Sequence, residues 1–480
     1  MIYASRPARY PLIAAAALLL ASLVVFAPGV AEYDSVEQFR QVLSGRYDDW
    51  HPPVMAWLWR RLLPFGDGAT RLLVLQLTGY WLGLGLIAGA LARIGRPTAG
   101  WMILLIGLLP PFLGWQAVVL KDAQLVGAAL GAFGLVAWWR LRDRPVPAAA
   151  ALLAALLFGY ALLVRANAAF ALAPLIAGLF PVRRAGALIV ASGVLLAVAL
   201  ALAGPVNHRL IGAVSSGVEK TQPLYDLAGI AVRAPGSHSV GLSRQAARQL
   251  RANDCVTPYF WDPLGDTPGC VAAMSPLKAQ RASDLYLRLA NAALHHPLAY
   301  LAQRVAHWNM TERWLVPARL AGAAPTGGSE PNNLGLASPG PQAQQWMWLA
   351  AQAVLTPLAW PFAWLLLALL LLVGTRRWRH APPRQLAIAL LASAVTLEFS
   401  FLAISIATDL RYHLWPMLAT ALAAVLLADT YPLRRVPAWM VLVAGLCLAA
   451  AVAERATLPD PPQEYEGLLH WTPPLSLLPA

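Results

Sequence analysis

Long apolar runs dominate the chain, and polar residues gather in the connections between them. A helix needs about 20 mostly apolar residues to cross a membrane, because lipid offers no partners for unpaired backbone groups. The pattern predicts eleven spans, at about residues 10–30, 71–92, 98–118, 123–139, 147–164, 168–181, 185–206, 346–373, 386–407, 414–431 and 437–454. Arg165 and Asn167 interrupt the apolar run 147–181, which could be two short helices or one broken helix.

The predicted fold is an all-α integral membrane protein with a large external loop that contains short helices. It divides into an N-terminal membrane module (1–206) with a first external loop (31–70), an external loop subdomain (207–345), C-terminal membrane helices (346–454) and a Pro-rich external tail (455–480).

Leucines at helical spacing predict a helix from Ser283 to Trp308, with Ser283 as a candidate N-cap and Pro297 as a break. Its second piece suits a helix that lies on the membrane surface. Residues 321–345, rich in Gly, Pro, Ala and Gln, are expected to form a flexible connection.

Arginine and lysine in short connections mark the cytoplasmic side of a membrane protein. With eleven alternating spans, one side receives Arg6, Arg9, Arg93, Arg96, Arg140, Arg142, Arg144, Arg183, Arg184, Arg376, Arg377, Arg379, Arg384, Arg434 and Arg435. The first apolar run exceeds the 7–15 residues of a signal-peptide core, which favours an uncleaved anchor over a cleaved signal. These features predict a bacterial inner-membrane protein whose candidate chemistry faces the periplasm.

Composition agrees with the membrane class, since 59% of residues are hydrophobic and only 12% are charged. The net charge of +13 could indicate nucleic-acid binding. Much of the excess is the cytoplasmic arginine set rather than one basic patch, so topology explains it and no nucleic-acid partner is expected.

Two of the three cysteines, Cys255 and Cys270, lie in the large external loop, and Cys447 lies in the last span as a small core residue. In an oxidising compartment Cys255 and Cys270 could form a disulfide, which would stabilise the loop by about 3 kcal/mol, or they could remain free thiols.

Candidate chemistry begins with Asp34, just after the first span, where partial burial could make the carboxylate a general base. The alternative is a solvated loop carboxylate. Asp122 could add a second carboxylate, and Lys121 beside it could bind a phosphate, although the two could also be a simple ion pair between spans.

Asp48, Asp49 and His51 form a second polar group in the first loop. A carboxylate and an imidazole could help to hold a divalent metal ion, but no third ligand is evident and a role in loop packing is favoured. No cofactor is otherwise indicated.

Arg165 would be costly within lipid unless it finds a partner or water, so it is expected to line a cavity or to reach outward. Arg411, in the turn Asp409-Leu410-Arg411-Tyr412-His413, has the fork geometry that suits phosphate oxygens, or it could pair with Asp409. Glu398 is the main deeply placed acid, and a Ser, Thr or Arg is expected as its partner.

An acid after the first span, a loop ending in Asp-Trp-His-Pro-Pro, an acid opening a later turn, an Arg-x-Asn break and a late Asp-x-Arg-Tyr turn together resemble the GT-C superfamily. These polytopic glycosyltransferases use lipid-linked sugar donors and include protein mannosyltransferases and the aminoarabinose transferase of lipid A. The layout covers nearly the whole chain. It departs from the family in lacking an adjacent Asp-Glu or Asp-x-Asp pair at Asp34 and a soluble domain after the last span.

The resemblance implies that Asp34 and Asp122 are catalytic acids and that Arg411 and Tyr412 lie near the lipid phosphate, with Lys121 and Arg165 as further phosphate-binding candidates. It implies a polyprenyl-phosphate sugar and membrane lipid as partners, a glycan, lipid or protein acceptor, and inversion if attack is direct. Acceptor recognition then falls to the large loop, where Tyr225 and Trp261 could contact sugars, although loop packing is the simpler role.

Two other classes share parts of this pattern. A surface-polysaccharide polymerase or ligase would use a lipid-linked oligosaccharide as donor. A lipid-linked glycan transporter or flippase would be expected to carry ionisable residues near the bilayer midplane and inverted repeats, neither of which is clear in the sequence.

Overall fold

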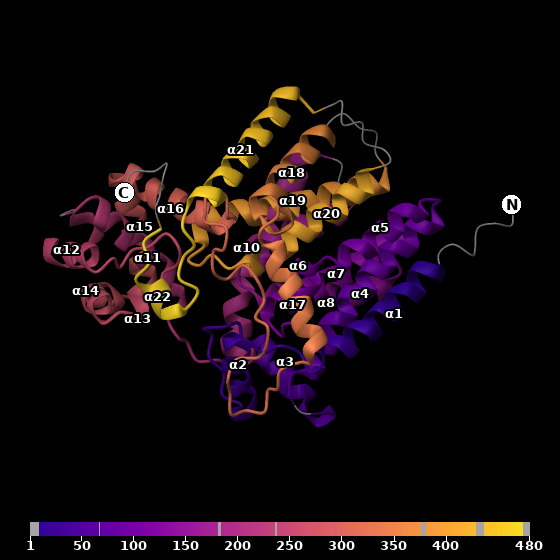
Figure 1. Cartoon of the computed structure of the whole chain (residues 1–480), viewed down its shortest axis with the longest axis horizontal. Coiled ribbons are helices and arrows are strands. Elements are labelled where there is room, and N and C mark those ends of the chain that lie inside the picture. Colours follow the sequence, from indigo (N-terminus) through magenta and orange to yellow (C-terminus); the bar gives the residue numbers. More distant parts are fainter. Residues whose placement is uncertain are drawn as a thin grey trace.

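The computed structural model describes residues 9–66, 68–180, 184–235, 238–375, 381–428 and 436–473. Within these residues every regular element is a helix, and the only β-pairing consists of two isolated bridges. The helices form an elongated bundle with a smaller helical subdomain at one end (Figure 1). The predicted all-helical class is therefore confirmed.

Seven helices of the described chain are long and apolar enough to cross a membrane. They are α1 (Arg9–Phe26), α4 (Thr70–Arg93), α7 (Lys121–Arg140), α10 (Ala185–Pro205) with its continuation η2 (Val206–Leu210), α19 (Pro382–Ile404), η6 (Leu410–His413) continued by α20 (Leu414–Ala428), and α21 (Ala438–Thr457). The pair α5 (Pro97–Gly107) and α6 (Pro110–Gln116), bent by 59°, would make an eighth. By length and composition, these helices are those of an α-helical membrane protein.

Three further apolar helices coincide with predicted spans but are shorter, namely α8 (Ala148–Val164), α9 (Ala168–Leu179) and α18 (Pro361–Thr375). The count of eleven spans therefore stays a prediction. The run 147–181 forms two helices, α8 and α9, which meet at Arg165–Asn167.

The predicted single span 346–373 is wrong. Instead α17 (Pro341–Ala353) ends before the short turn η5 (Pro357–Ala359), and α18 begins at Pro361. Pro357 and Pro361 lack the N–H that would continue a helix. The two pieces then diverge, because α17 packs against α6 and α1 whereas α18 packs against α19 and α20.

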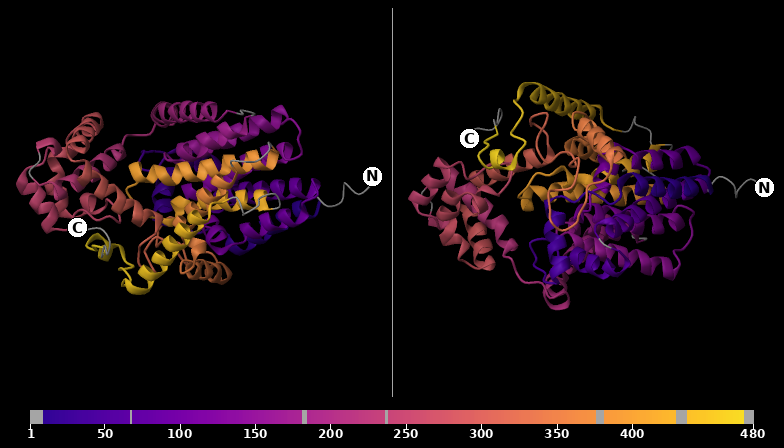
Figure 2. Two further views of the ribbon diagram at one scale, coloured as in Figure 1. Left: turned by 90° about the horizontal axis from the view of Figure 1, so that it is seen from above. Right: turned by 60° about the horizontal axis from the view of Figure 1, so that its bottom comes forward.

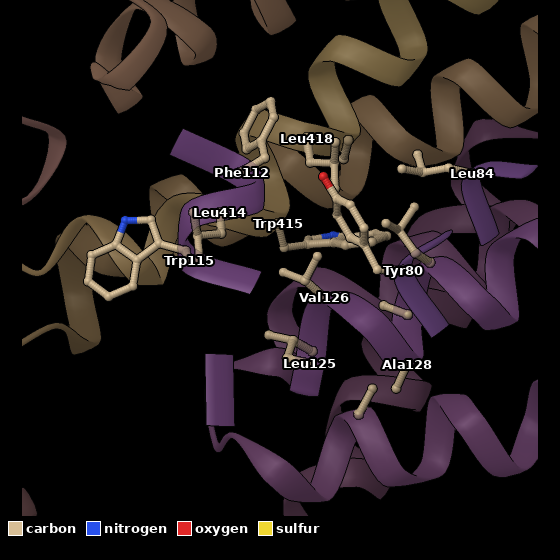
Figure 3. Packing of buried hydrophobic residues seen from close by; sticks show 14 of the residues in the cluster. Tyr80, Leu84, Phe112, Trp115, Leu125, Val126, Ala128, Leu414, Trp415 and Leu418 are labelled. Carbon is tan, nitrogen blue, oxygen red and sulfur yellow. The ribbon is translucent and has the colours of Figure 1, made fainter. Parts of the chain in front are cut away.

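Close backbone contact between α4 and α7 forms the centre of the bundle. A Cβ atom on Gly83 would lie 2.4 Å from the carbonyl oxygen of Leu130, and one on Gly79 would lie 2.5 Å from that of Gly127. Small residues at such spacing let membrane helices pack backbone to backbone. Trp415, at the start of α20, points into the core beside Tyr80 of α4 and Val126 of α7, and Leu414 lies near Trp115 of α6 (Figure 3).

The helical subdomain lies at one end of the bundle in each view (Figure 2). Its helices are η3 (Val218–Lys220), α11 (Thr221–Arg233), η4 (His238–Val240), α12 (Arg244–Ala252), α13 (Pro263–Asp266), α14 (Pro268–Lys278), α15 (Ala282–His295) and α16 (Pro297–Glu312). They enclose a core of their own, and the structure joins Cys255 to Cys270 in a disulfide. Next to the subdomain, α2 (Tyr33–Ser44), α3 (Val54–Leu62) and η1 (Leu63–Phe65) fill the first loop.

The predicted break at Pro297 is confirmed, because α15 ends at His295 and α16 begins at Pro297. Ser283 is not the N-cap, since α15 already begins at Ala282 and Arg281 occupies that position. Leu294 and Leu298 are both 81% exposed, while the polar face of α16 is buried against the bundle. Whether this face lies on a membrane stays a prediction.

Arginines gather at the end of the bundle away from the subdomain. Arg96 donates to the carbonyl oxygens of Leu426 and Val425 at the end of α20, and Arg140 donates to that of Leu179 at the end of α9. Part of the predicted cytoplasmic set lies outside the described residues, namely Arg6, Arg183, Arg376, Arg377, Arg379, Arg434 and Arg435.

The glycine contacts give a testable prediction. Gly83→Ala should lower the thermal stability of the purified protein by several degrees, because the added methyl group cannot fit against the α7 backbone. Gly159→Ala is the matched control, since Gly159 also lies within a helix but has nothing within 4 Å of the added Cβ. Equal melting temperatures for the two variants would contradict the proposed packing.

Candidate functional site

Three connections that are far apart in sequence meet where the bundle joins the subdomain. The chain after α1 pairs with the chain before α7, since the Val30 N–H donates to the carbonyl of Ala117 at 3.0 Å and the Val119 N–H donates to that of Val30 at 2.8 Å. The Ser35 hydroxyl also donates to the carbonyl of Val119, at 2.8 Å. This parallel bridge places the start of α2 beside the start of α7.

Buried amide side chains hold the backbone that forms this bridge. Gln76 of α4 donates to the carbonyls of Gln116 at 2.6 Å and Val118 at 2.9 Å, which satisfies the irregular backbone before α7. Gln124 donates to the Gln76 side chain at 2.7 Å. Sequence reasoning missed both glutamines, although a polar side chain within a long apolar run is a recognisable signal.

Arg411 of η6 is the centre of the site. Its guanidinium group lies 3.0 Å from Asp34, 3.1 Å from Asp409, 3.2 Å from Glu32 and 3.9 Å from Asp122. The Arg411 side chain is only 12% exposed. One guanidinium therefore connects carboxylates from all three connections, which is the fork geometry that Arg offers and Lys does not.

Lys121 and His51 complete the surroundings of Asp34. The Lys121 ammonium lies 3.1 Å from Asp34 and 2.7 Å from Nδ1 of His51. Because an ammonium group can only donate, Nδ1 of His51 must accept, which places the imidazole proton on Nε2. That nitrogen lies 3.6 Å from Oδ1 of Asp34.

Arg165 forms the second cationic arm. It projects from the break between α8 and α9, pairs with Asp122 through Nη1 and donates from Nε to the side chain of Asn167 at 2.8 Å. Its guanidinium carbon lies 4.2 Å from the centroid of the Tyr412 ring, a cation–π contact. The Arg-x-Asn break thus serves to bring a cation to the site.

The carboxylates respond differently to burial. Burial acts to raise the pKa of Asp34, but Arg411, Lys121 and His51 outweigh it, so the pKa lies well below the usual value. For Glu32 burial dominates over Arg411, and the nearby Asp34 and Asp409 add to it, so the pKa rises to about 7. Asp34 is therefore ionised at neutral pH, while Glu32 titrates there.

His51 is neutral at physiological pH. Burial, followed by the charge of Lys121, lowers its pKa to about 3. Its contact with Asp34 is therefore a polar contact rather than an ion pair.

Residues 321–340 are irregular and hydrogen-bonded to the chain beside the site, whereas residues 341–345 already belong to α17. The expected flexible connection 321–345 is therefore wrong for its last five residues and stays a prediction for the rest. The Ala31 N–H donates to the Ser329 hydroxyl at 3.0 Å, and the Glu330 N–H donates to the carbonyl of Ala31 at 2.8 Å. Gly322 has φ +68°, and a Cβ atom there would lie 2.5 Å from a carboxylate oxygen of Asp409. Glycine adopts this positive φ without strain and has no Cβ atom that would clash with Asp409.

The structure brings seven of the predicted site residues together, namely Asp34, His51, Lys121, Asp122, Arg165, Arg411 and Tyr412. Both interpretations of Arg411 hold in part, since it pairs with Asp409 and also with more distant acids. Glu32 and Asp409 belong to the same cluster but had not been assigned site roles. The Glu-x-Asp spacing at residues 32–34 could have indicated Glu32.

Four of the residues predicted to contact an acceptor or to pack a loop lie outside the Arg411 cluster, namely Asp48, Asp49, Tyr225 and Trp261. Asp48 accepts from the Trp50 N–H at 3.0 Å, and Asp49 accepts from Ser216, so both hold loops. Tyr225 is fully buried in the subdomain core and donates to the carbonyl of Thr257, so it presents no surface to an acceptor.

Trp261 lies against the partly exposed Trp50, with ring centroids 6.0 Å apart. It therefore takes part in packing between the first loop and the subdomain.

The first-loop metal interpretation is not supported, because His51 faces Lys121 whereas Asp49 faces Ser216. In the described residues, the group that could hold a metal is Glu312, Glu398 and His413. The predicted Ser, Thr or Arg partner of Glu398 is wrong, since His413 lies 2.6 Å from its carboxylate.

No protein-family model matches the chain, and no curated protein or solved structure matches it significantly. The resemblance to the GT-C superfamily therefore depends on the residues and their arrangement alone.

Removing the central guanidinium should destabilise the protein. Arg411→Ala leaves several partly buried carboxylates without their shared cation, which should cost about 3 kcal/mol and lower the melting temperature. Arg40→Ala is the matched control, because Arg40 pairs with Glu37 at the surface and should cost less than about 1 kcal/mol. If the two variants melt together, Arg411 does not neutralise the cluster.

Proposed function

We propose that the chain is a membrane glycosyltransferase that moves a sugar from a polyprenyl-phosphate donor to a cell-envelope acceptor. The reaction would occur at the periplasmic face of a bacterial inner membrane. The observation that carries the proposal is the cluster of Arg411, Arg165 and Lys121 with acidic side chains at one end of an apolar bundle. This is the arrangement that an amphiphilic donor with a lipid tail and a phosphate headgroup requires.

Arg411 and Arg165 are the proposed phosphate ligands. In a little-hydrated site, cations near a leaving phosphate stabilise the negative charge that develops as the glycosidic bond breaks. Nε of Arg411 and Oδ2 of Asp122 are buried and make no conventional hydrogen bond within the described chain, although they face each other at 3.9 Å. Donor binding would rearrange this weak contact and let the guanidinium bind phosphate oxygens.

Glu32 and Asp34 have different roles in the proposed transfer. The acceptor hydroxyl oxygen attacks the anomeric carbon, and the bond to the phosphate oxygen breaks with its electron pair. Glu32 takes the proton of that hydroxyl, because its pKa of about 7 suits proton transfer at neutral pH. Asp34, held ionised by its cations, positions Lys121 and Arg411 beside the leaving phosphate. A single displacement of this kind inverts the anomeric centre.

A groove in the membrane part offers room for the donor tail. It has a volume of about 590 Å³ and runs between α9, α10 and α19, with mainly apolar side chains in its wall. Ala169 and Phe170, which line it, follow Arg165 by four and five residues. A polyprenyl chain in the groove would therefore be continuous with a phosphate at Arg165.

A polysaccharide polymerase or ligase could use the same chemistry with a larger donor. The discriminating measurement is turnover of a donor that carries one sugar, because an oligosaccharide-specific enzyme would not accept it.

Replacement of the ionised acid tests the proposal directly. Asp34→Asn should reduce transfer from a polyprenyl-phosphate sugar by at least about 100-fold, since it removes a charged acceptor that contacts Lys121 and Arg411. Asp284→Asn, at an exposed pair with Arg281, is the control and should retain activity. Wild-type turnover in a folded Asp34→Asn protein would rule out this role.

The pH dependence separates the two acids. With Glu32 as base, kcat/KM should fall about tenfold per pH unit below about pH 7, because the protonated acid cannot accept the proton. Glu32→Gln should be slow and lack this dependence. A wild-type profile that stays flat down to about pH 5 would assign the base role to Asp34, whose pKa is lowered.

A further inference from the structure

A second polar cluster lies at the junction of the subdomain and the bundle. It joins Glu312 at the end of α16, Glu398 of α19 and His413 of η6, and one candidate ligand atom from each lies within 4.8 Å of the others. All three side chains are almost completely buried. The cluster is separate from the acids that surround Arg411.

Charge balance is the unusual feature of this cluster. Neither carboxylate oxygen of Glu312 makes a conventional hydrogen bond within the described residues, and the same holds for Oε1 of Glu398 and Nε2 of His413. Two ionised carboxylates without a cation would be very costly at such burial. The cluster must therefore hold protons or a metal cation.

The nearby arginine does not supply the missing charge. Arg313 follows Glu312 directly but donates to the carbonyl oxygens of Leu320, Ala321 and Thr408. Its guanidinium therefore faces these carbonyl groups and makes no ion pair with Glu312 within the described residues.

We propose that Glu312, Glu398 and His413 bind a divalent transition-metal ion, with Zn²⁺ as the best match. One imidazole and two carboxylates form a ligand set that zinc accepts, with a fourth position for water. Ca²⁺ and Mg²⁺ fit less well because they prefer six or more oxygen ligands.

The geometry requires only small movements. Donor atoms around one zinc ion lie about 3–4 Å apart. The candidate ligand atoms lie within 4.8 Å of one another, so side-chain movements of about 1 Å would suffice. The ion would replace the 2.6 Å contact between His413 and Glu398. It would then fasten α16 of the subdomain to α19 and fix η6, which carries Arg411 two residues before His413.

Metal analysis of the purified full-length chain tests this site without an activity assay. The protein should be prepared with a tag that binds no metal, and metal content should be measured by mass spectrometry after dialysis and after addition of ZnCl₂. We expect about one equivalent of Zn²⁺ per chain and a melting temperature that falls when a strong chelator removes it.

Glu312→Gln and His413→Ala should each lose the bound zinc, whereas Asp284→Asn should keep it. If Glu312→Gln does not fold, the metal content and chelator response of the wild-type protein still decide the question. Wild-type protein that contains no metal and shows no shift with ZnCl₂ would overturn the proposal in favour of shared protons. Zinc that persists in folded Glu312→Gln and His413→Ala proteins would place the ion elsewhere and overturn it as well.

Discussion

The need to neutralise buried charge at one end of an apolar bundle governs this structure. Arg411 lies between acids that come from two distant connections and its own turn, and Lys121 and Arg165 pair with the acids that Arg411 shares. Each charge would be costly in this setting alone, so the connections are stable only when they meet. The same constraint produces an acid that titrates near neutral pH beside one that stays ionised.

Packing within the apolar bundle positions the charged cluster around Arg411. Glycines let α4 and α7 approach closely, and Trp415 anchors the start of α20 in the core with its indole N–H donating to Ser393 at 2.8 Å. Arg411 lies four residues before that anchor. Packing of the bundle therefore fixes where the guanidinium lies, and residues 321–340 are hydrogen-bonded to the chain beside it.

Hydrophobic periodicity was sufficient to predict the helical class and the positions of most apolar helices, and the wrong span at 346–373 follows from underestimating Pro357 and Pro361. Much of the cluster could also be predicted from the sequence, because Asp34, Asp122, Arg165 and Arg411 stand out at the ends of apolar runs. The ion pair of Glu32 with Arg411 and the burial of Tyr225 depend on tertiary contacts between remote segments, and the pairing of Glu398 with His413 depends on how the chain turns between α19 and η6. A single sequence carries little signal for such contacts.

A cryo-electron microscopy structure of the protein with a polyprenyl-phosphate sugar would show where the lipid phosphate binds. We expect phosphate density within about 4 Å of the guanidinium groups of Arg165 and Arg411, with the tail between α9, α10 and α19 and the sugar toward Glu32. Lipid density at another surface, with every ion pair of Arg411 unchanged, would contradict this expectation.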